Sequence, residues 1–389
     1  MREKLIDSFK IMLGDKGREL SLYFSPGRVN LIGEHIDYNG GYVFPCALDF
    51  GTYAVTAKRE DRKFRMYSLN FENKGIIEFD LDLLENNPDH DWVNYPKGVL
   101  KVMKDAGYLV EKGLDVLFFG NIPNGAGLSS SASLEVLMGT LLRDEFNLDI
   151  DMVDIVKLSQ KAENQFIGVN CGIMDQFAVG MGKKDHAILL NCDTLDYKYA
   201  PLVLEGISIV IANTNKRRGL GESKYNERRA SCEAAVSDLQ ASGMDIRYLC
   251  EMDNEKFQEV KHLIKSEESI RRARHAVSEN VRVMEAMKKL NAGDITGFGE
   301  LMNQSHISLR DDYEVTGVEL DSLVEASWKA PGILGARMTG AGFGGCTVAL
   351  VKDESIKDFI EQVGKEYREK TGLVADFYVA KVGDGARKI

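Results

Sequence analysis

The N-terminal part of the chain alternates hydrophobic and polar positions in short runs, a pattern that is typical of β-strands. These runs cover residues 41–58, 63–69, 75–80 and 114–120. Arg28 lies in a further short extended segment, Arg-Val-Asn-Leu-Ile. Before all of them, MREKLIDSFKIMLGDKG predicts an amphipathic helix whose apolar side is formed by Leu5, Ile6, Phe9, Met12 and Leu13.

Helical spacing dominates the middle of the chain. A helix is predicted over 129–146 from the recurrence of Leu134, Leu137, Met138, Leu141 and Leu142. Further helical patterns lie at about 151–167, about 220–310, 317–329 and 353–371. Strand-like runs lie at 186–190, 207–212 and 374–382, and two more surround a glycine loop before the last helix.

This mixture of strands and helices lacks a strict β-α-β alternation, which favours an α+β fold over a doubly wound sheet. A chain of 389 residues is long for one hydrophobic core, so we expect two domains. The change from mixed elements to long helices places their boundary near 200–206. We therefore predict domains at 1–203 and 204–389.

Composition narrows the classes of partner. Hydrophobic residues make up 44% and charged residues 28%, as in ordinary globular proteins. A formal net charge of -11 argues against nucleic acid or an anionic membrane as the main partner. Six cysteines without a Cys-x-x-Cys pair suggest reduced thiols in a cytoplasmic protein, and no apolar run is long enough to span a bilayer.

The segment Gly27–Gly41, GRVNLIGEHIDYNGG, concentrates polar side chains beside an apolar strand. Glu34, His35 and Asp37 follow Gly33. Ionised carboxylates accept two hydroxyl hydrogen bonds, and imidazole can donate or accept. This mixture suits a ligand covered with hydroxyl groups, such as a sugar. The alternative is a polar turn after an edge strand.

The segment 122–142, IPNGAGLSSSASLEVLMGTLL, places a glycine loop before an amphipathic helix. Backbone N–H groups at a helix N-terminus attract anions, and a serine there can cap the helix or face a phosphate-bound metal. No Lys-Ser/Thr pair follows the glycines, so this is not a Walker loop. An ordinary turn with a serine cap is the alternative, although one cap needs only one serine.

Two further segments carry candidate chemistry. In AENQFIGVNCGIMDQ, Glu163 and Asp175 could accept a proton or bind a metal, or could be ordinary charges at helix ends. The segment RMTGAGFGGC matches Gly-x-Gly-x-x-Gly, but strand-like residues follow it where a dinucleotide-binding unit would begin a helix. We expect a glycine loop that joins two strands near a ligand.

The order of these four motifs resembles that of galactokinases, within the GHMP small-molecule kinase superfamily. The resemblance extends over nearly the whole chain and includes KYNERR after the predicted boundary. One difference is Ile36, where the family usually has threonine. The resemblance implies the two-domain GHMP kinase fold, with an N-terminal domain like ribosomal protein S5 domain 2, a ferredoxin-like C-terminal domain, and the active site in the cleft between them.

Galactokinases transfer the γ-phosphoryl group of ATP to the C1 hydroxyl of α-D-galactose, the first committed step of galactose catabolism. The resemblance implies that Asp175 is the base and Arg28 its cationic neighbour. It assigns the sugar to Glu34, His35, Ile36, Asp37 and Tyr225. It assigns the triphosphate to Gly125, Ala126, Gly127, Leu128, Ser129, Ser130 and Ser131. Ser131 and Glu163 would hold Mg²⁺, Ser68 would lie near the nucleotide, and Trp92 would border the adenine.

Alternatives to this function stay open at this stage. One is a kinase for another acceptor, such as N-acetylgalactosamine, mevalonate or homoserine, and another is a non-catalytic sensor of galactose and ATP. The Glu-His-x-Asp cluster favours a neutral polyol, and the uninterrupted GLSSSAS loop with Asp175 favours catalysis. We expect a cytoplasmic monomer whose partners are small molecules, with neither nucleic acid nor membrane among them.

Overall fold

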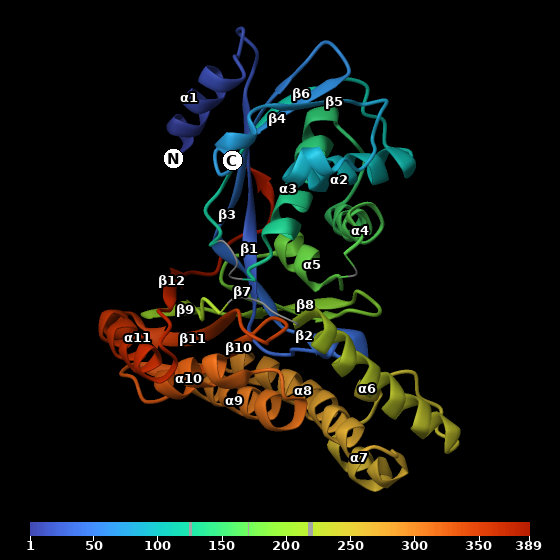
Figure 1. The fold of residues 1–389 in the computed structure, drawn as a ribbon, viewed down its shortest axis with the longest axis vertical. Coiled ribbons are helices and arrows are strands. Elements are labelled where there is room, and N and C mark those ends of the chain that lie inside the picture. The colour runs from blue at the N-terminus through green and yellow to red at the C-terminus, as the bar shows by residue number, and fades with distance from the viewer. Residues whose placement is uncertain (124–126, 170, 217–220) are drawn as a thin grey trace.

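The computed structural model describes residues 1–123, 127–169, 171–216 and 221–389, which form two lobes (Figure 1). The upper lobe in Figure 1 carries both chain ends and helices α1 to α5, and the lower lobe carries helices α6 to α11. The helices are α1 (Arg2–Met12), α2 (Asn94–Asp105), α3 (Ser130–Phe146), α4 (Met152–Ala162), α5 (Met174–Met181), α6 (Gly221–Ala241), α7 (Asn254–Val260), α8 (Glu267–Asn291), α9 (Ile295–Ser308), α10 (Gly317–Ser327) and α11 (Ile356–Thr371).

The upper lobe is built on a six-stranded sheet in the order β13-β1-β3-β6-β4-β5. Its strands are β1 (Ser21–Asn30), β3 (Pro45–Lys58), β4 (Lys63–Ser68), β5 (Ile77–Asp80), β6 (Leu114–Gly120) and β13 (Arg387–Lys388). Neighbours run antiparallel except β4 and β6, which are parallel. A smaller sheet, β2 (Tyr42–Val43), β7 (His186–Asn191) and β8 (Tyr197–Pro201), lies below it.

Both faces of the large sheet are buried, which explains its hydrophobic strands. Successive residues of β3 point to opposite faces: Val55 packs with Leu5 and Phe9 of α1, whereas Ala54 belongs to the core that includes α2 and α3. The predicted N-terminal helix is thereby confirmed, with Leu5, Phe9 and Leu13 buried, whereas Met12 of the predicted apolar side is exposed and Ile6 is half-buried.

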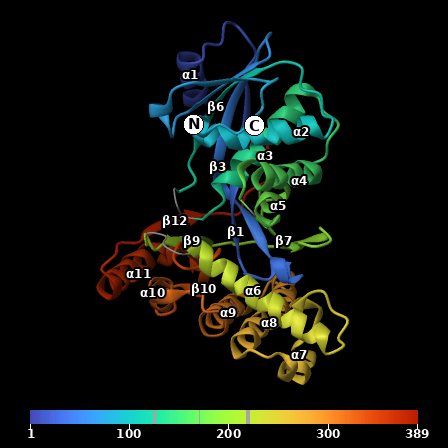
Figure 2. The same ribbon diagram turned by 45° about the vertical axis from the view of Figure 1, so that its right-hand side comes forward.

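The lower lobe contains a four-stranded sheet, β10-β11-β9-β12, with helices against it (Figure 2). Its strands are β9 (Ile207–Asn213), β10 (Ile333–Thr339), β11 (Cys346–Lys352) and β12 (Asp376–Ala380). Ile209 and Ile211 face one hydrophobic core, whereas Val210 and Ala212 face the core formed with α10 and α11. β10 and β11 surround the glycine loop, as the sequence predicted.

The sequence patterns predicted most elements but not α2, α5, β8 or β13. Pro96 and Gly98 interrupt the helical pattern of α2. Pro96 lies in the first turn, where its missing N–H costs no intrahelical bond, and a Cβ on Gly98 would lie 2.9 Å from Phe166. Among the described helices, none is long and apolar enough to cross a membrane.

The chain end returns to the upper lobe. β13 pairs with β1 through Tyr23 and Phe24, and Val382 bridges to Leu48 of β3. The predicted division into residues 1–203 and 204–389 therefore does not describe the last strand, β13, which forms the edge of the N-terminal sheet.

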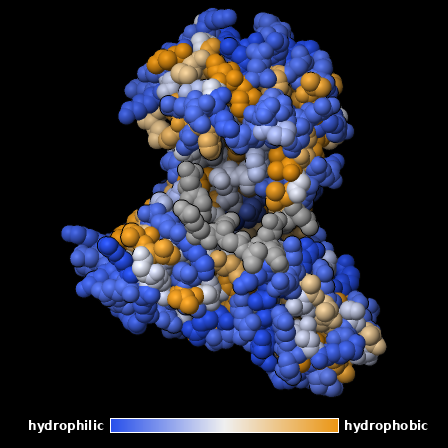
Figure 3. Space-filling model, in the orientation of Figure 1, coloured by the Kyte–Doolittle hydropathy of each residue, from blue (hydrophilic) through white to orange (hydrophobic). Residues whose placement is uncertain are grey.

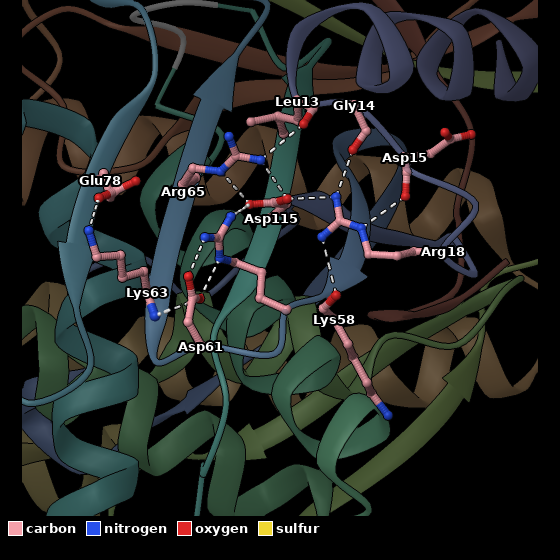
Figure 4. Close-up of polar contacts among 11 residues, drawn as sticks. Leu13, Gly14, Asp15, Arg18, Lys58, Asp61, Lys63, Arg65, Glu78 and Asp115 are labelled. Carbon is pink, nitrogen blue, oxygen red and sulfur yellow. Dashed lines mark hydrogen bonds and ion pairs between the residues drawn. The ribbon is translucent and has the colours of Figure 1, made fainter.

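A buried carboxylate, Asp115 of β6, joins four parts of the upper lobe far from the glycine loop (Figure 4). Arg65 of β4 donates to both carboxylate oxygens at 2.7 Å, and Arg18 and Arg59 donate at 2.7 and 2.9 Å. Arg65 also donates to the carbonyl oxygen of Leu13, at the end of α1. We call these four residues the Asp115 cluster; it ties α1 and the start of β1 to the sheet.

Candidate active site

All four sequence motifs contribute residues to one cavity of about 340 Å³ between the lobes. Figure 3 shows the molecule hollowed at this level, where the two lobes meet. Arg28, Asp175, Gly127 to Ser131 and most of the loop from Thr339 to Cys346 line it. The predicted loop residues Gly125 and Ala126 lie outside the described residues.

Arg28 and Asp175 form a bidentate ion pair at this cavity. Arg28 Nε donates to Asp175 Oδ1 and Nη2 donates to Oδ2, both at 2.8 Å. Arg28 Nη1 donates to the carbonyl oxygen of Gly127 at 2.9 Å. β1 and the first turn of α5 carry the pair. One guanidinium thus orients the carboxylate and the glycine loop together.

The start of α3 points its first turn toward the same cavity, because Ser129, Ser130 and Ser131 line it. Ser131 also hydrogen-bonds the side chain of Glu163, in the π-helical turn Glu163–Ile167. Burial raises the pKa of Glu163, and the bond from Ser131 acts in the opposite direction. The two residues assigned to Mg²⁺ therefore lie in contact.

Gln176 connects Glu163 to a second buried carboxyl group. Its Nε2 donates to Glu163 Oε2 at 2.6 Å and to Glu135 Oε2 at 3.1 Å. Burial and the neighbouring Glu163 raise the pKa of Glu135 to about 10, so Glu135 is protonated at neutral pH. Of the two carboxyl groups, Glu163 is then the one that can be ionised and bind a cation.

The side-chain oxygens of Ser131 and Glu163 suit Mg²⁺ as ligands. Proteins usually hold this ion with one or two carboxylates and the phosphate oxygens of a substrate. Ser131 and Glu163 offer a hydroxyl and a carboxylate beside the glycine loop. Within the described part of the chain, no group of three or more His, Cys, Asp or Glu side chains could hold a metal ion alone.

Glu34 is buried where the two lobes meet. Its Oε1 accepts hydrogen bonds from Thr339 Oγ1 at 3.0 Å and from the Gly340 N–H at 2.8 Å. Arg337 Nη2 lies 3.2 Å from the same oxygen. Strand β10 therefore determines how Glu34, which follows β1, is oriented.

His35 adopts a left-handed backbone (φ 63°) and is buried. Nε2 lies 3.2 Å from the carbonyl oxygen of Ala341, and Nδ1 lies 2.8 Å from Tyr38 Oη. Burial lowers the pKa of His35 to about 4, so the ring is neutral. Since a carbonyl oxygen only accepts, Nε2 carries the proton and Nδ1 accepts from Tyr38.

Asp37 and Tyr225 line a second cavity, of about 360 Å³, beside Gly172. Burial and the negative charge of Glu34 raise the pKa of Asp37 to about 6. The ring of Tyr225 lies 5.5 Å from that of His35, between centroids. Ile36, the other residue assigned to the sugar, packs in the hydrophobic core, so its backbone rather than its side chain is left for a ligand.

Ser68 and Trp92 line a third cavity, of about 240 Å³, with Phe71, Tyr95 and Phe118. Trp92 packs edge-on against Phe118, with centroids 5.5 Å apart, and stacks with Phe71 at 6.4 Å. This aromatic cavity suits a flat base. Ser130 and Ser131 line both this cavity and the glycine-loop cavity, so the two are adjacent.

Comparisons with known proteins identify the family. Three family models match the chain. The model described as "Galactokinase galactose-binding signature" matches residues 7–58, the model "GHMP kinases N terminal domain" matches 94–183, and the model "GHMP kinases C terminal" matches 285–369. The chain is 62% identical over 389 residues to the galactokinase of Fusobacterium nucleatum subsp. nucleatum, and all of both chains is covered. The chain belongs to the galactokinase family.

Solved structures agree with this assignment. The Lactococcus lactis galactokinase complexed with galactose has a TM-score of 0.94 at 51% identity, covering 100% of both chains. Methanococcus jannaschii mevalonate kinase has a TM-score of 0.67 at 18% identity, covering 95% of this chain and 99% of that one, which shows the shared fold alone. The GHMP kinase fold and an enzyme of the galactokinase family, both expected from the motifs, are confirmed.

Several residues that support the galactokinase motifs were not predicted. Arg337 and Thr339 lie three residues and one residue before Gly340 in the fourth motif, so their position was a usable signal. His275 and Glu279 of α8 had no such signal. Glu279 accepts from the Gly33 N–H at 2.9 Å, and His275 Nε2 donates to the Glu34 carbonyl oxygen at 3.1 Å, across 241 residues. α8 thus holds the backbone of the Glu34 segment.

Proposed function

We propose that this protein transfers the γ-phosphoryl group of ATP to the C1 hydroxyl of α-D-galactose, giving galactose 1-phosphate and ADP. The observation that carries the proposal is the Arg28–Asp175 ion pair in the cavity formed by the glycine-serine loop. The galactokinases of similar sequence support the choice of substrate.

Asp175 takes the proton from the C1 hydroxyl in this proposal. Arg28 keeps the carboxylate oriented through two hydrogen bonds and contributes positive charge beside the transferred group. Phosphoryl transfer depends mainly on positioning and electrostatics, and a general base typically adds about 10²–10⁴-fold. Fixing one carboxylate beside the phosphate-binding loop serves both needs.

The sugar hydroxyls are bound by Glu34, His35, Asp37 and Tyr225. Glu34 Oε1 is engaged by β10, which leaves Oε2 for a ligand. Both ring nitrogens of neutral His35 already have protein partners, so a sugar hydroxyl would replace Ala341 or Tyr38 at this ring. Ionised Asp37 can accept two hydroxyl hydrogen bonds. The backbone of Ile36 belongs to the same segment.

The phosphates of ATP lie along Gly125 to Ser131, and the adenine enters the aromatic cavity beside Ser68 and Trp92. Ser131 and Glu163 would hold Mg²⁺, which supplies positive charge to the phosphate oxygens when bound. The adjacent cavities that share Ser130 and Ser131 support this path for the nucleotide.

One assay of ADP release over galactose, glucose, N-acetylgalactosamine and mevalonate tests the function. We expect turnover with galactose that requires Mg²⁺. Turnover with mevalonate alone would contradict a sugar kinase, and a preference for N-acetylgalactosamine would reassign the acceptor. Binding of galactose and ATP without ADP release would identify a sensor.

The proposal also includes that the protein is a monomer and lies in the cytoplasm. Gel filtration tests the oligomeric state, and cell fractionation tests the location.

A further inference from the structure

The backbone of Ser129 has an unusual conformation for a serine. Its φ is 61° and its ψ is 52°, in the left-handed region that favours glycine. Its side chain is buried in the wall of the glycine-loop cavity. A non-glycine residue in this region costs free energy, which persists only where the surroundings impose it and which often marks a functional site.

The hydroxyl of Ser129 is not used as a helix cap, although Ser129 occupies the N-cap position of α3, where serine usually accepts from a backbone N–H. It donates instead to Asp175 Oδ2 at 2.5 Å, across 46 residues of chain. The strained backbone thus directs a buried hydroxyl to the carboxylate proposed as the base.

The hydrogen bonds of Asp175 then differ between its two oxygens. Oδ2 accepts from both Ser129 Oγ and Arg28 Nη2, whereas Oδ1 accepts from Arg28 Nε. A carboxylate offers two lone pairs on each oxygen. Among the described contacts, Oδ2 is therefore fully engaged and Oδ1 retains one free acceptor position.

We propose that Ser129 is a positioning residue for phosphoryl transfer: its hydroxyl engages Asp175 Oδ2, so that Oδ1 is the oxygen that accepts the C1 proton. In that step the C1 oxygen bonds to the γ-phosphorus, the bond from that phosphorus to ADP breaks, and the proton moves to Oδ1. This inference rests on the proposed function. It assigns the first serine of the loop to orienting the Asp175 carboxylate rather than to binding the nucleotide.

Two substitutions separate the hydroxyl from the backbone. Ser129→Ala removes the hydroxyl and keeps a side chain at positive φ, whereas Ser129→Gly removes the hydroxyl and relieves the strain. We expect both variants to lose about 10- to 100-fold in kcat, since hydrogen bonds to charged groups are of that strength. The KM values for galactose and ATP should change less than about twofold, because only the transition state is affected.

Ser133→Ala is the matched control on the same helix. Its buried hydroxyl donates to the Ser25 carbonyl oxygen at 2.8 Å and lies 2.9 Å from Thr52 Oγ1, away from Asp175. We expect this variant to have a lower Tm and an unchanged kcat. Ser129→Gly should have a Tm at least equal to that of Ser129→Ala.

A double-mutant cycle with Asp175→Asn completes the test. If Ser129 acts through Asp175, adding Ser129→Ala to Asp175→Asn should cost less than about twofold more in kcat, since coupled residues are not additive. Full additivity would overturn the inference, as would a wild-type kcat in Ser129→Gly or a loss confined to the ATP KM. Failure of the wild-type protein to phosphorylate galactose would instead overturn the proposed function.

Discussion

Arg337 and Glu34 form a buried contact between the two lobes, with Arg337 Nη2 3.2 Å from Glu34 Oε1. Arg337 Nη1 also donates to the carbonyl oxygen of Asn30 at 3.0 Å, at the end of β1. One arginine of β10 therefore holds both the strand that carries Arg28 and the carboxylate assigned to the sugar. The arginine that joins the lobes therefore also contacts the carboxylate proposed to bind the sugar.

Replacing Arg337 by lysine should weaken sugar binding selectively. A lysine has a single nitrogen and cannot reach Asn30 and Glu34 with separate donors. We expect the galactose KM to rise about tenfold or more, because the buried ion pair with Glu34 is lost, while the ATP KM stays unchanged. Steady-state kinetics with each substrate varied would measure this. A parallel rise in both KM values would show a general loss of structure instead.

Asp175→Asn should leave both substrates bound and remove most turnover. Asparagine keeps the shape of the side chain but cannot accept the C1 proton. We expect kcat to fall about 10²–10⁴-fold, with the dissociation constants of galactose and ATP within a few-fold of wild type. Calorimetric titration and single-turnover assays measure the two effects separately. Near-normal turnover would exclude the role of general base.

Ser131→Ala should raise the requirement for Mg²⁺ and ATP. Ser131 contacts Glu163 and lines both the glycine-loop cavity and the aromatic cavity, so its loss removes one proposed metal ligand. The concentration of Mg²⁺ that gives half-maximal activity and the ATP KM should both increase, more than the galactose KM. A chelator should abolish turnover of the wild-type protein, and added Mg²⁺ should restore it. An increase confined to the galactose KM would contradict a metal role.

Galactose binding should weaken in acid because of Asp37. Burial and Glu34 raise the pKa of Asp37 to about 6, so the carboxylate becomes protonated as the pH falls below 6 and loses its capacity to accept two hydroxyl bonds. His35, with a pKa lowered to about 4, stays neutral over this range. Titration of galactose without ATP from pH 8 to 5 should show a rising dissociation constant.

Asp37→Asn provides the control for this pH effect and a second result. Its galactose affinity should be low but nearly independent of pH. Because the raised pKa penalises the folded ionised state, the variant without sugar should have a higher Tm than wild type above pH 6, and the difference should disappear as the pH falls toward 4. A Tm of Asp37→Asn below that of wild type at pH 8 would contradict the argument that ionised Asp37 destabilises the folded protein.

Asp115→Asn should lower stability without affecting the chemistry. Burial alone would raise the pKa of Asp115, but hydrogen bonds from Arg65, Arg18 and Arg59 lower it. Removing a buried partner leaves these guanidiniums uncompensated and costs about 3–5 kcal/mol of unfolding free energy. Denaturant unfolding should show this loss, with kcat at low temperature unchanged. Asp82→Asn, in an exposed pair with Arg62, should change stability little.

Local sequence patterns were sufficient for most elements. The apolar positions Leu5, Phe9 and Leu13 recur at helical spacing, and each is buried in the structure. The strand-like residues 114–120 form β6, and the glycine motif at 340–345 joins β10 to β11. These features depend on residues close together in the chain, whose backbone preferences and periodic burial do not need the rest of the fold.

The motifs also indicated which residues could take part in catalysis or binding. Only the tertiary structure showed which of these residues contact one another. Asp175 pairs with Arg28 across 147 residues and not with the nearby Glu163. Ile36, in the middle of the sugar motif, faces the core. A motif specifies which side chains are available, whereas the packing of distant strands and helices decides which way each one points.

The tertiary structure alone revealed which contacts hold the site together. Arg337, Glu279 and Ser129 act through contacts with segments 46 to more than 240 residues away. Buried polar groups need partners, and in a two-lobed protein those partners come from whichever element is packed against them. The sequence therefore determined the elements, the family and the reactive side chains, and the packing of the two lobes determined their orientation.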